Sequence, residues 1–361
     1  MSGSRLHEEK GAGATIGLDG LAETVMSDLA RVGLVTPGVA EEQGQVRSAE
    51  TGLDLFLPLL TRHDIRLVPT VREGCPVRFC TGILKMTVPQ SEAAASAERS
   101  IPAGGQGDSE KNAAFGCLGE LAERVSLCSL GAHDPRVFGR TEKQPEVDLV
   151  AMLGLSDSQV LAAARRAGLS VGAAETQAPD LSGLSRRRVA IRNLASGQVA
   201  QLPAFAALFQ EGKTEAGGRV SFASTVGCAV WPTSEGARSR ALLELAERDA
   251  VAQAWYNRLG ISRLDRGQLM ELLPASLIAY LDRQPREWGV YALRTDLKVG
   301  VVLAVSYEAG GLRCAFGSAA GWDLASACNN ALEELLQSEN SLSLMEKAYP
   351  ADAANGPAAG R

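Results

Sequence analysis

The sequence is poor in the residues on which several classes of protein depend. Aromatic residues make up 5% of the 361 residues, and the net charge is −6. Base-stacking surfaces need aromatic residues and phosphate-binding surfaces need a basic excess, so we expect no nucleic-acid partner. No apolar run approaches the roughly 20 residues of a membrane-spanning helix, and the polar N-terminus does not resemble a signal peptide. We therefore expect neither a membrane protein nor an exported one.

Cysteine and histidine are too scattered for several familiar sites. The seven cysteines contain no Cys-x-x-Cys pair and are odd in number, which argues against a zinc knuckle and a disulfide framework. We expect reduced thiols and a cytoplasmic location. The three histidines, His7, His63 and His133, stand in no recognisable motif, so neither a histidine metal site nor a Ser-His-Asp triad is indicated. Hydrophobic residues at 45% and charged residues at 22% are typical of a globular protein with one large or two medium domains.

What the sequence does contain is a short acidic pattern that occurs three times. Residues 120–124 and 244–248 both read Glu-Leu-Ala-Glu-Arg, and residues 331–338 align without a gap on residues 241–248. Each copy lacks proline and consists of good helix formers, so we expect three helices. Residues three apart share a helix face, which points a pair of acids, or a glutamate and a glutamine, in one direction in each copy.

The surroundings of these faces leave two interpretations open. Leucines and alanines flank the second copy, which predicts a helix covered on several sides and a core position for Trp255, on the same face as Glu244. Carboxylates there need donors or cations, which Arg124, Arg248 or a bound metal ion can supply, because an unpaired buried charge is very costly. The alternative is that the three faces are solvated and only pair with arginines, which is the commoner arrangement for a single copy.

Strand pairs and helices alternate along the rest of the chain. An amphipathic pattern predicts a helix over residues 17–33, and further helices are expected within residues 145–170. Expected strands are residues 66–71, 77–80, 188–194, 198–205, 299–307 and 312–316. The last four of these form two hairpins. Because strand pairs precede at least the later two acidic helices, we predict an α+β fold with helices packed on sheets.

A loop is expected over residues 89–110, which are rich in alanine, serine and glycine. Its end, residues 104–109, reads as a glycine-rich turn that leads into the first acidic helix. A turn of this kind can hold an anion at the helix N-terminus.

Three stretches of the sequence together resemble the YcaO family. They are residues 104–107 with 119–124, residues 224–229 with 235–237 and 242–255, and residues 331–338. The pattern Glu-x-x-Glu-Arg-Asp-Ala after Ser-Thr-x-Gly-x-Ala is more specific than Glu-x-x-Glu-Arg alone. The resemblance implies a YcaO-like domain over residues 61–345. Outside it we expect a partly disordered N-terminal segment 1–60 and a flexible tail 346–361. No motif assigns residues 1–60 a role, and partner binding is the one considered for them.

The resemblance also implies an activity. Members of this family use ATP and Mg²⁺ to phosphorylate a backbone amide oxygen of a precursor peptide. A Cys, Ser or Thr side chain attacks that amide, and loss of phosphate leaves a thiazoline or oxazoline ring. The implied function is this azoline-forming cyclodehydration in the biosynthesis of a peptide antibiotic of the microcin or trifolitoxin type. The implied partners are the precursor peptide, a leader-binding protein and a flavin dehydrogenase. A homodimer is left open.

The implied site comes from the three acidic helices. Those expected to bind Mg²⁺, directly or through water, are Glu120, Glu123, Glu244 and Glu247. Those expected to border the nucleotide are Arg248, as a phosphate contact, with Glu334, Gln337 and Gln106. Carboxylates for the metal and charge neutralisation for the phosphates are what phosphoryl transfer requires. No catalytic residue is implied.

Five positions depart from the family pattern. Gly116 stands where a small hydroxyl residue is usual, Pro232 where asparagine is usual, Gly236 where glutamate is usual, Asn330 near a usual arginine, and Gln106 in place of a lysine. Several of these changes remove a charge near the implied nucleotide. The alternative function is therefore a catalytically degenerate scaffold or peptide-binding subunit of a modification complex.

Overall fold

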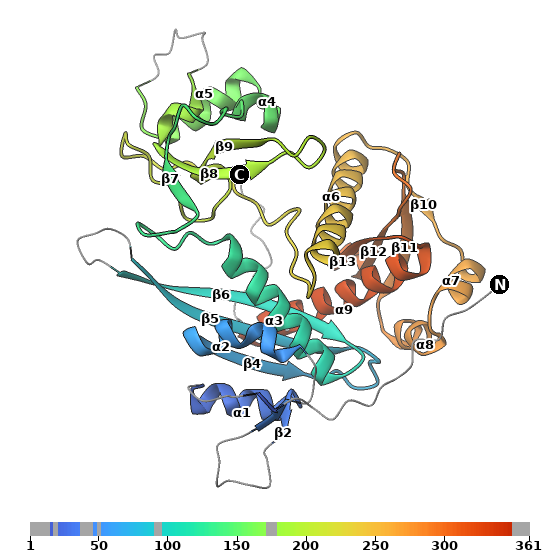
Figure 1. Cartoon of the computed structure of the whole chain (residues 1–361). Coiled ribbons are helices and arrows are strands. Elements are labelled where there is room, and N and C mark those ends of the chain that lie inside the picture. Colours follow the sequence, from blue (N-terminus) through green and yellow to red (C-terminus); the bar gives the residue numbers. More distant parts are fainter. Residues whose placement is uncertain are drawn as a thin grey trace, which may run out of the picture. The chain divides into compact units, whose positions relative to one another are not determined.

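The computed structural model describes residues 15–16, 21–36, 46–48, 52–89, 96–170 and 179–348, and Figure 1 shows its elements. The chain divides into two compact units. The first comprises Met1–Lys85, Ser100–Glu123 and Val226–Arg361, and the second comprises Met86–Arg99 and Arg124–Thr225. Among the helices of the described ranges, none is both long and apolar enough for a bilayer crossing.

The N-terminal part of the first unit contains one helix and a small sheet. Helix α1, Glu23–Arg31, lies within the predicted span of 17–33, and residues 17–20 fall outside the described ranges. The short strands β1 (Thr15–Ile16), β3 (Val46–Ser48) and β2 (Val35–Thr36) pair antiparallel in that order. Asp28 of α1 accepts hydrogen bonds from Arg31, from Arg66 and from the backbone N–H of Leu67, which ties the helix to the strand formed by Asp64–Thr70.

A second sheet, in the order β4-β5-β6, carries the first acidic helix. Its strands are β4 (Asp64–Thr70), β5 (Arg78–Pro89) and β6 (Ser96–Gly107), preceded by η1 (Leu53–Phe56) and α2 (Leu57–Arg62) and followed by α3 (Glu110–Leu127). The division between the units falls within β5, β6 and α3. The strands predicted at 66–71 and 77–80 are confirmed, and β5 continues well beyond the prediction.

The loop predicted over residues 89–110 is wrong over residues 96–107, which form strand β6. Residues 90–95 lie outside the described ranges. The small residues that suggested a loop serve close packing instead, because a Cβ added to Gly105 would lie 2.0 Å from the backbone oxygen of Ala113 in α3. The predicted glycine-rich turn at 104–109 is therefore mostly the end of a strand.

A third sheet carries the last acidic helix. Its antiparallel order is β10 (Ser262–Arg263), β11 (Glu287–Leu293), β12 (Gly300–Glu308) and β13 (Leu312–Gly321). The predicted hairpin of β12 and β13 is confirmed, with η4 (Ala309–Gly311) as its turn, whereas β11 was not predicted. Helix α9, Leu324–Ala348, packs on β12 and β13, and it includes the first three residues of the predicted tail; residues 349–361 lie outside the described ranges.

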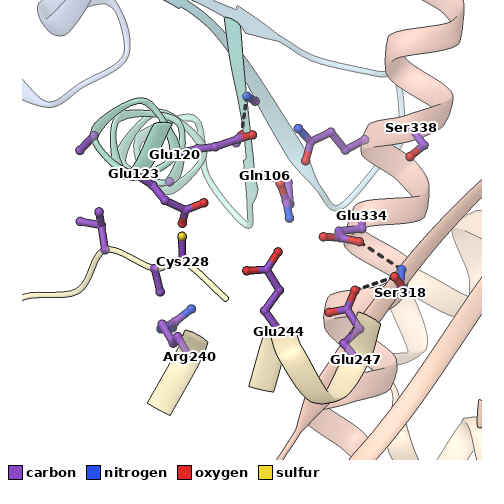
Figure 2. Close-up of a pocket in the computed structure, with 18 of the residues that line it drawn as sticks. Gln106, Glu120, Glu123, Cys228, Arg240, Glu244, Glu247, Ser318, Glu334 and Ser338 are labelled. Carbon is purple, nitrogen blue, oxygen red and sulfur yellow. Dashed lines mark hydrogen bonds between the residues drawn. The ribbon is translucent and has the colours of Figure 1, made fainter. Parts of the chain in front are cut away.

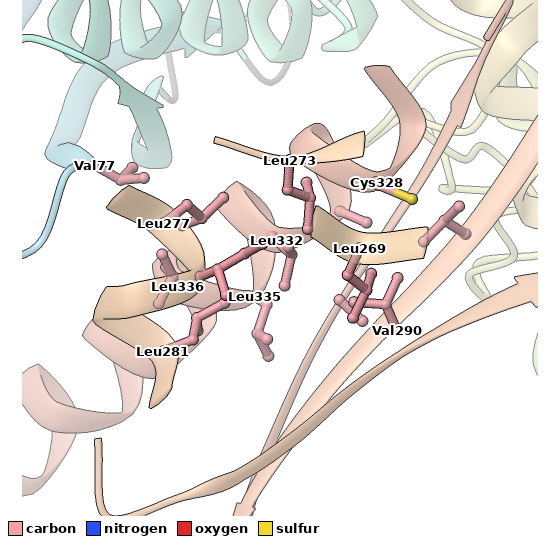
Figure 3. Close-up of a cluster of buried hydrophobic side chains, with 14 of the residues drawn as sticks. Val77, Leu269, Leu273, Leu277, Leu281, Val290, Cys328, Leu332, Leu335 and Leu336 are labelled. Carbon is pink, nitrogen blue, oxygen red and sulfur yellow. The ribbon is translucent and has the colours of Figure 1, made fainter. Parts of the chain in front are cut away.

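A large hydrophobic cluster joins this sheet to three helices, as Figure 3 shows. Helices α7 (Arg266–Leu272) and α8 (Ala275–Arg283) contribute Leu269 and Leu277, and α9 contributes Leu332 and Leu335. Each fully buried leucine stabilises the fold by about 1.5–3 kcal/mol. This cluster fixes α9, and with it the last acidic pattern, on the sheet.

Helix α6, Ser234–Tyr256, carries the middle acidic copy and departs from two predictions. Its buried residues are Ala246, Glu247 and Ala250, whereas Leu242 and Leu245 are about half exposed, so the helix is not covered on several sides. Trp255 is 78% exposed and does not belong to the core. Glu244, on the same helix face, lines a cavity, whereas Trp255 is not among the lining residues.

The second unit is a separate small α+β assembly. Strands β7 (Val137–Gly139), β8 (Arg187–Arg192) and β9 (Val199–Pro203) form its sheet, with helices α4 (Leu149–Leu153) and α5 (Asp157–Arg166) and the short turns η2 (Leu181–Leu184) and η3 (Ala204–Ala206). The hairpin predicted within residues 188–205 and the helices within 145–170 are confirmed. The predicted α+β class therefore holds in both units.

Candidate active site

The three acidic patterns lie on α3, α6 and α9, and all three face one cavity of about 1200 Å³ in the first unit. Figure 2 shows the carboxylates converging from the three helices. We call this the acidic cavity; its glutamates are Glu120, Glu123, Glu244, Glu247 and Glu334. The interpretation in which the three faces are merely solvated does not hold, because all five glutamates are buried or half-buried and border one partly open cavity.

One glutamate, at the same aligned position of each pattern, accepts a hydrogen bond from a backbone N–H group. Gly104 donates to Glu120 at 2.7 Å, Gly227 to Glu244 at 3.1 Å, and Ser318 to Glu334 at 3.1 Å. The donors precede their glutamates by 16, 17 and 16 residues. The three copies thus share a hydrogen bond as well as a sequence pattern, and a bond from N–H to a carboxylate is a strong one. The N–H of Gly104, in the turn predicted to hold an external anion, instead donates to the carboxylate of Glu120.

Ser318 joins two of the acidic helices and was not predicted from the sequence. Its hydroxyl donates to Glu247 Oε1 at 2.7 Å, while its backbone N–H binds Glu334. A close contact places it there, because a Cβ on the preceding Gly317 would lie 2.3 Å from the backbone oxygen of Ala331. The signal that finds Ser318 is its spacing before Glu334, which matches that of Gly104 before Glu120.

The electrostatics of the acidic cavity raise the pKa of two of its carboxyl groups, those of Glu247 and Glu334. Desolvation by burial is the main cause that raises the pKa of Glu247 to about 7; the Ser318 hydrogen bond and Arg248 oppose it, and Glu334 and Glu244 add to it. Burial also raises the pKa of Glu334, with Glu120 and Glu244 adding to the effect. Neighbouring carboxylates that share a partly desolvated space ionise reluctantly, so the cavity favours a bound cation.

Two arginines line the acidic cavity, against five glutamates. Arg248 lies 3.3 Å from Glu247 Oε1 and 3.8 Å from Glu244 Oε1. The second, Arg240, was not singled out in the sequence; its guanidinium lies 3.7 Å from the centre of the Trp231 ring. The arginines therefore neutralise only part of the negative charge.

The remaining predicted residues are also placed. Gln106 and Gln337 line the acidic cavity, and the Gln337 amide lies over β6, where a Cβ on Gly104 would be 1.9 Å from it. Of the positions that depart from the family pattern, Gly116 and Pro232 line the cavity as well. Asn330 is exposed and is not among the lining residues. The structure thus brings all eight predicted site residues together, while their roles stay predictions.

The residues fit Mg²⁺ that arrives with a polyphosphate better than a metal ion held by protein alone. Within the described ranges, no three acidic, histidine or cysteine side chains lie close enough to hold an ion by themselves. Mg²⁺ usually keeps several waters and is bound through one or two carboxylates and substrate phosphates. Glutamates on three sides of one cavity, two of them with raised pKa values, provide such ligands.

The sequence profile of one family matches residues 104–358, more than half of the chain. The family is described as YcaO cyclodehydratase, binding ATP and Mg²⁺. The chain therefore belongs to the YcaO family of cyclodehydratases. No curated protein matches it.

Solved structures share the fold. YcaO from Methanopyrus kandleri, bound with AMPPCP and Mg²⁺, is similar with a TM-score of 0.53 and 18% identity over 77% of this chain and 63% of that one. A heterocyclase in complex with substrate and cofactor gives a TM-score of 0.57 and 20% identity over 76% of this chain and 37% of that one. The E. coli microcin synthetase McbBCD complex gives a TM-score of 0.51 and 16% identity over 80% of this chain and 67% of that one. The chain thus spans less than two thirds of the first two structures.

Proposed function

We propose that this protein is an ATP- and Mg²⁺-dependent peptide cyclodehydratase that forms azoline rings in a precursor peptide during the biosynthesis of a peptide antibiotic. The observation that carries the proposal is the convergence of three acidic helix faces on one cavity in a member of the YcaO family. The structural neighbour bound with AMPPCP and Mg²⁺ supports it, as does the heterocyclase in complex with substrate and cofactor.

Each part of the acidic cavity has a task in this proposal. The Mg²⁺ ligands would be Glu120, Glu123, Glu244 and Glu247, and the nucleotide would lie beside Gln106, Glu334, Gln337 and Arg248. When bound, ATP with Mg²⁺ supplies the phosphoryl group that makes an amide oxygen a good leaving group. Glu247 gives up its proton near pH 7, so a cation displaces that proton at little cost. Ser318 keeps Glu247 and Glu334 in fixed orientations.

The apolar residues that line the same cavity suit a peptide. They include Leu55, Phe56, Phe115, Phe316, Leu342 and Met345. Phe56 and Phe115 pack edge to face, with ring centres 5.2 Å apart, and Phe316 and Met345 are mostly exposed. Ligand sites combine apolar walls with a few polar groups that set orientation. We propose that the peptide lies along this wall, with the reacting amide toward the glutamates.

The structural neighbours support the proposal that this chain works with partner proteins. The E. coli structure is a complex of microcin synthetase proteins, and we propose that this chain also works with a leader-binding protein and a flavin dehydrogenase. Residues 1–60 as a partner-binding segment, a homodimer and a cytoplasmic location stay predictions of the sequence.

The test is reconstitution with a precursor peptide and the leader-binding protein. We expect the peptide to lose the mass of one water molecule per ring, only when ATP and Mg²⁺ are present, with release of phosphate. The precursor is sought as a short Cys- and Ser-rich reading frame beside the gene. Absence of both the mass loss and calorimetric heat at millimolar Mg·ATP, with every partner present, would defeat the proposal.

A second function is favoured by the charges missing at Gln106 and Gly236. In that case the chain is a degenerate scaffold that binds the peptide or a partner without nucleotide. Peptide binding that is tight and independent of ATP, together with no heat from Mg·ATP, would select this function over the first.

A further inference from the structure

The two arginines of the acidic cavity are in different electrostatic situations. Arg248 lies within ion-pair distance of Glu244 and Glu247, so these two carboxylates largely neutralise its charge. Among the described side chains, Arg240 has no carboxylate within 4.0 Å. Desolvation lowers the pKa of the Arg240 guanidinium, as expected of a cation that lacks an acidic partner. Arg240 is thus the lining cation with charge available to a ligand.

Arg240 is held in place by Trp231 rather than by an acid. Its guanidinium lies over the indole ring at 3.7 Å, which is a close cation–π contact. The glycine at 236 makes room for the indole, because a Cβ there would lie 1.9 Å from Trp231 Cδ1. Trp231 and Arg240 both line the cavity. Stacking of its face leaves the edge of the guanidinium, with its fork of N–H donors, for a planar or tetrahedral oxyanion.

The charges of the acidic cavity define the chemistry of its ligand. A bare metal ion would satisfy the glutamates but not Arg240. A bare anion would meet Arg240 but would be repelled by the ionised glutamates. A ligand that carries a divalent cation and phosphate oxygens together satisfies both groups, because the cation binds carboxylates and the phosphates bind the guanidinium.

We propose that Arg240, stacked on Trp231, binds a phosphate group of the nucleotide, a task that the sequence assigned to Arg248. The proposal rests on the proposed function, since it presumes a nucleotide in the acidic cavity. It also gives a reason for glycine at position 236, where the family pattern has glutamate. A side chain there would collide with the Trp231 ring on which Arg240 stacks.

The experiment compares Arg240→Gln with Arg238→Gln by calorimetry. Arg238 is exposed, lies on the same helix and is not among the lining residues. We expect Arg240→Gln to weaken Mg·ATP binding at least tenfold and magnesium tripolyphosphate binding by a similar factor. Arg238→Gln should match the wild type.

Two further variants guard against a trivial loss of fold. Arg240→Lys keeps the charge but not the planar fork, so it should lie between the wild type and Arg240→Gln. Trp231→Phe keeps an aromatic ring and should retain most of the affinity, and all variants should melt within a few degrees of the wild type. A uniform loss of affinity in variants that melt early would overturn the assignment.

The outcomes separate this inference from the function beneath it. If the wild type gives no heat with Mg·ATP, the proposed function fails and the inference with it. If the wild type binds and Arg240→Gln binds equally well, only the inference fails. If Arg240→Gln loses affinity for the peptide and not for the nucleotide, Arg240 serves a peptide carboxylate and the assignment is overturned.

Discussion

Two buried carboxylates, one in each unit, show opposite electrostatics. Asp134 in the second unit is 3% exposed, and Glu247 in the first is 7% exposed. Burial alone would raise the pKa of Asp134, but hydrogen bonds from the Arg136 side chain and from the backbone N–H groups of Leu130 and Arg136 hold it at about 2. The pKa of Glu247 rises to about 7, because burial and two neighbouring glutamates outweigh one hydroxyl and one arginine.

The second unit repeats the pattern of Asp134 elsewhere. The fully buried Arg188 lies 2.7 Å from Glu146, and Arg187 lies 2.8 Å from Glu211. There the chain neutralises its own buried charges. The acidic cavity instead gathers five glutamates around two arginines. Carboxyl groups with raised pKa values, gathered in a cavity, are typical of functional sites, whereas paired ones are typical of structural sites.

The largest expected effect is on activity. Glu247→Gln should lower the rate of peptide modification by about 10²–10³-fold, because it removes one of the proposed carboxylate ligands of Mg²⁺, which neutralises charge during phosphoryl transfer. Mass spectrometry of the precursor measures the rate. Glu235→Gln, on an exposed position of the same helix, is the matched control. A variant Glu247→Gln that works at the wild-type rate would place the acidic pattern outside the chemistry.

The same type of change should damage the second unit through its stability. Asp134→Asn breaks a buried ion pair with Arg136, whose Nη2 lies 2.6 Å from Asp134 Oδ2. Such losses typically cost about 3–5 kcal/mol. Chemical denaturation should show this cost for Asp134→Asn and not for Glu247→Gln. Equal stability of the two variants would contradict the structural role of Asp134 and the functional role of Glu247.

The pH dependence should separate the two carboxylates further. A carboxyl group whose pKa is raised from 4.5 to about 7 keeps its proton in the folded state, so the metal-free protein loses stability as pH rises through that window. Replacing Glu247 with glutamine should therefore stabilise the metal-free protein at pH 8 by roughly 2–3 kcal/mol. No gain should appear below pH 4. Melting in a chelating buffer across this range is the measurement, and a constant difference at every pH would contradict the shift.

The opposite sign applies to Asp134. Its pKa is depressed, so its contribution is present above its unfolded pKa of 3.8 and is lost as pH falls toward 2. Stability of Asp134→Asn should thus converge with that of the wild type in acid.

Ser318 should give the smallest effect. Ser318→Ala removes a hydrogen bond to Glu247, typically worth about 0.5–1.5 kcal/mol, and should lower the modification rate about tenfold or less. It should also shift the acidic limb of the pH–rate profile to higher pH, because loss of the Ser318 hydrogen bond, which favours ionised Glu247, raises the pKa of Glu247. Ser318→Thr should restore the profile. A rate loss that threonine does not rescue would indicate a packing defect instead.

Sequence patterns were sufficient for the parts of the structure that repeat or alternate. The acidic helices, the hairpins and the α+β class follow from helix formers, from strand pairs around turns, and from three matching copies. The eight predicted site residues share one cavity because the copies fold alike. Strand β6 was missed because small residues that allow close packing on α3 look like loop residues in a sequence.

Other features depend on contacts between distant residues. Ser318 matters through Glu247, which lies 71 positions earlier, and no local motif marks it. Arg240 gains its task from the indole at position 231 and from the glycine that makes room for it. Trp255 was placed in the core because its helix position was clear while the identity of the face was not. In each case the missing information was which neighbour would fill the space.

The most direct test of the account is binding of Mn²⁺ together with a nonhydrolysable ATP analogue, followed by electron paramagnetic resonance in the wild type and in four single Glu→Gln variants. The variants are at positions 120, 123, 244 and 247. The account predicts a bound Mn²⁺–nucleotide signal in the wild type and at least tenfold weaker binding in every variant. Wild-type affinity in the variants at both 244 and 247 would contradict the claim that the three acidic helix faces hold the metal and its nucleotide.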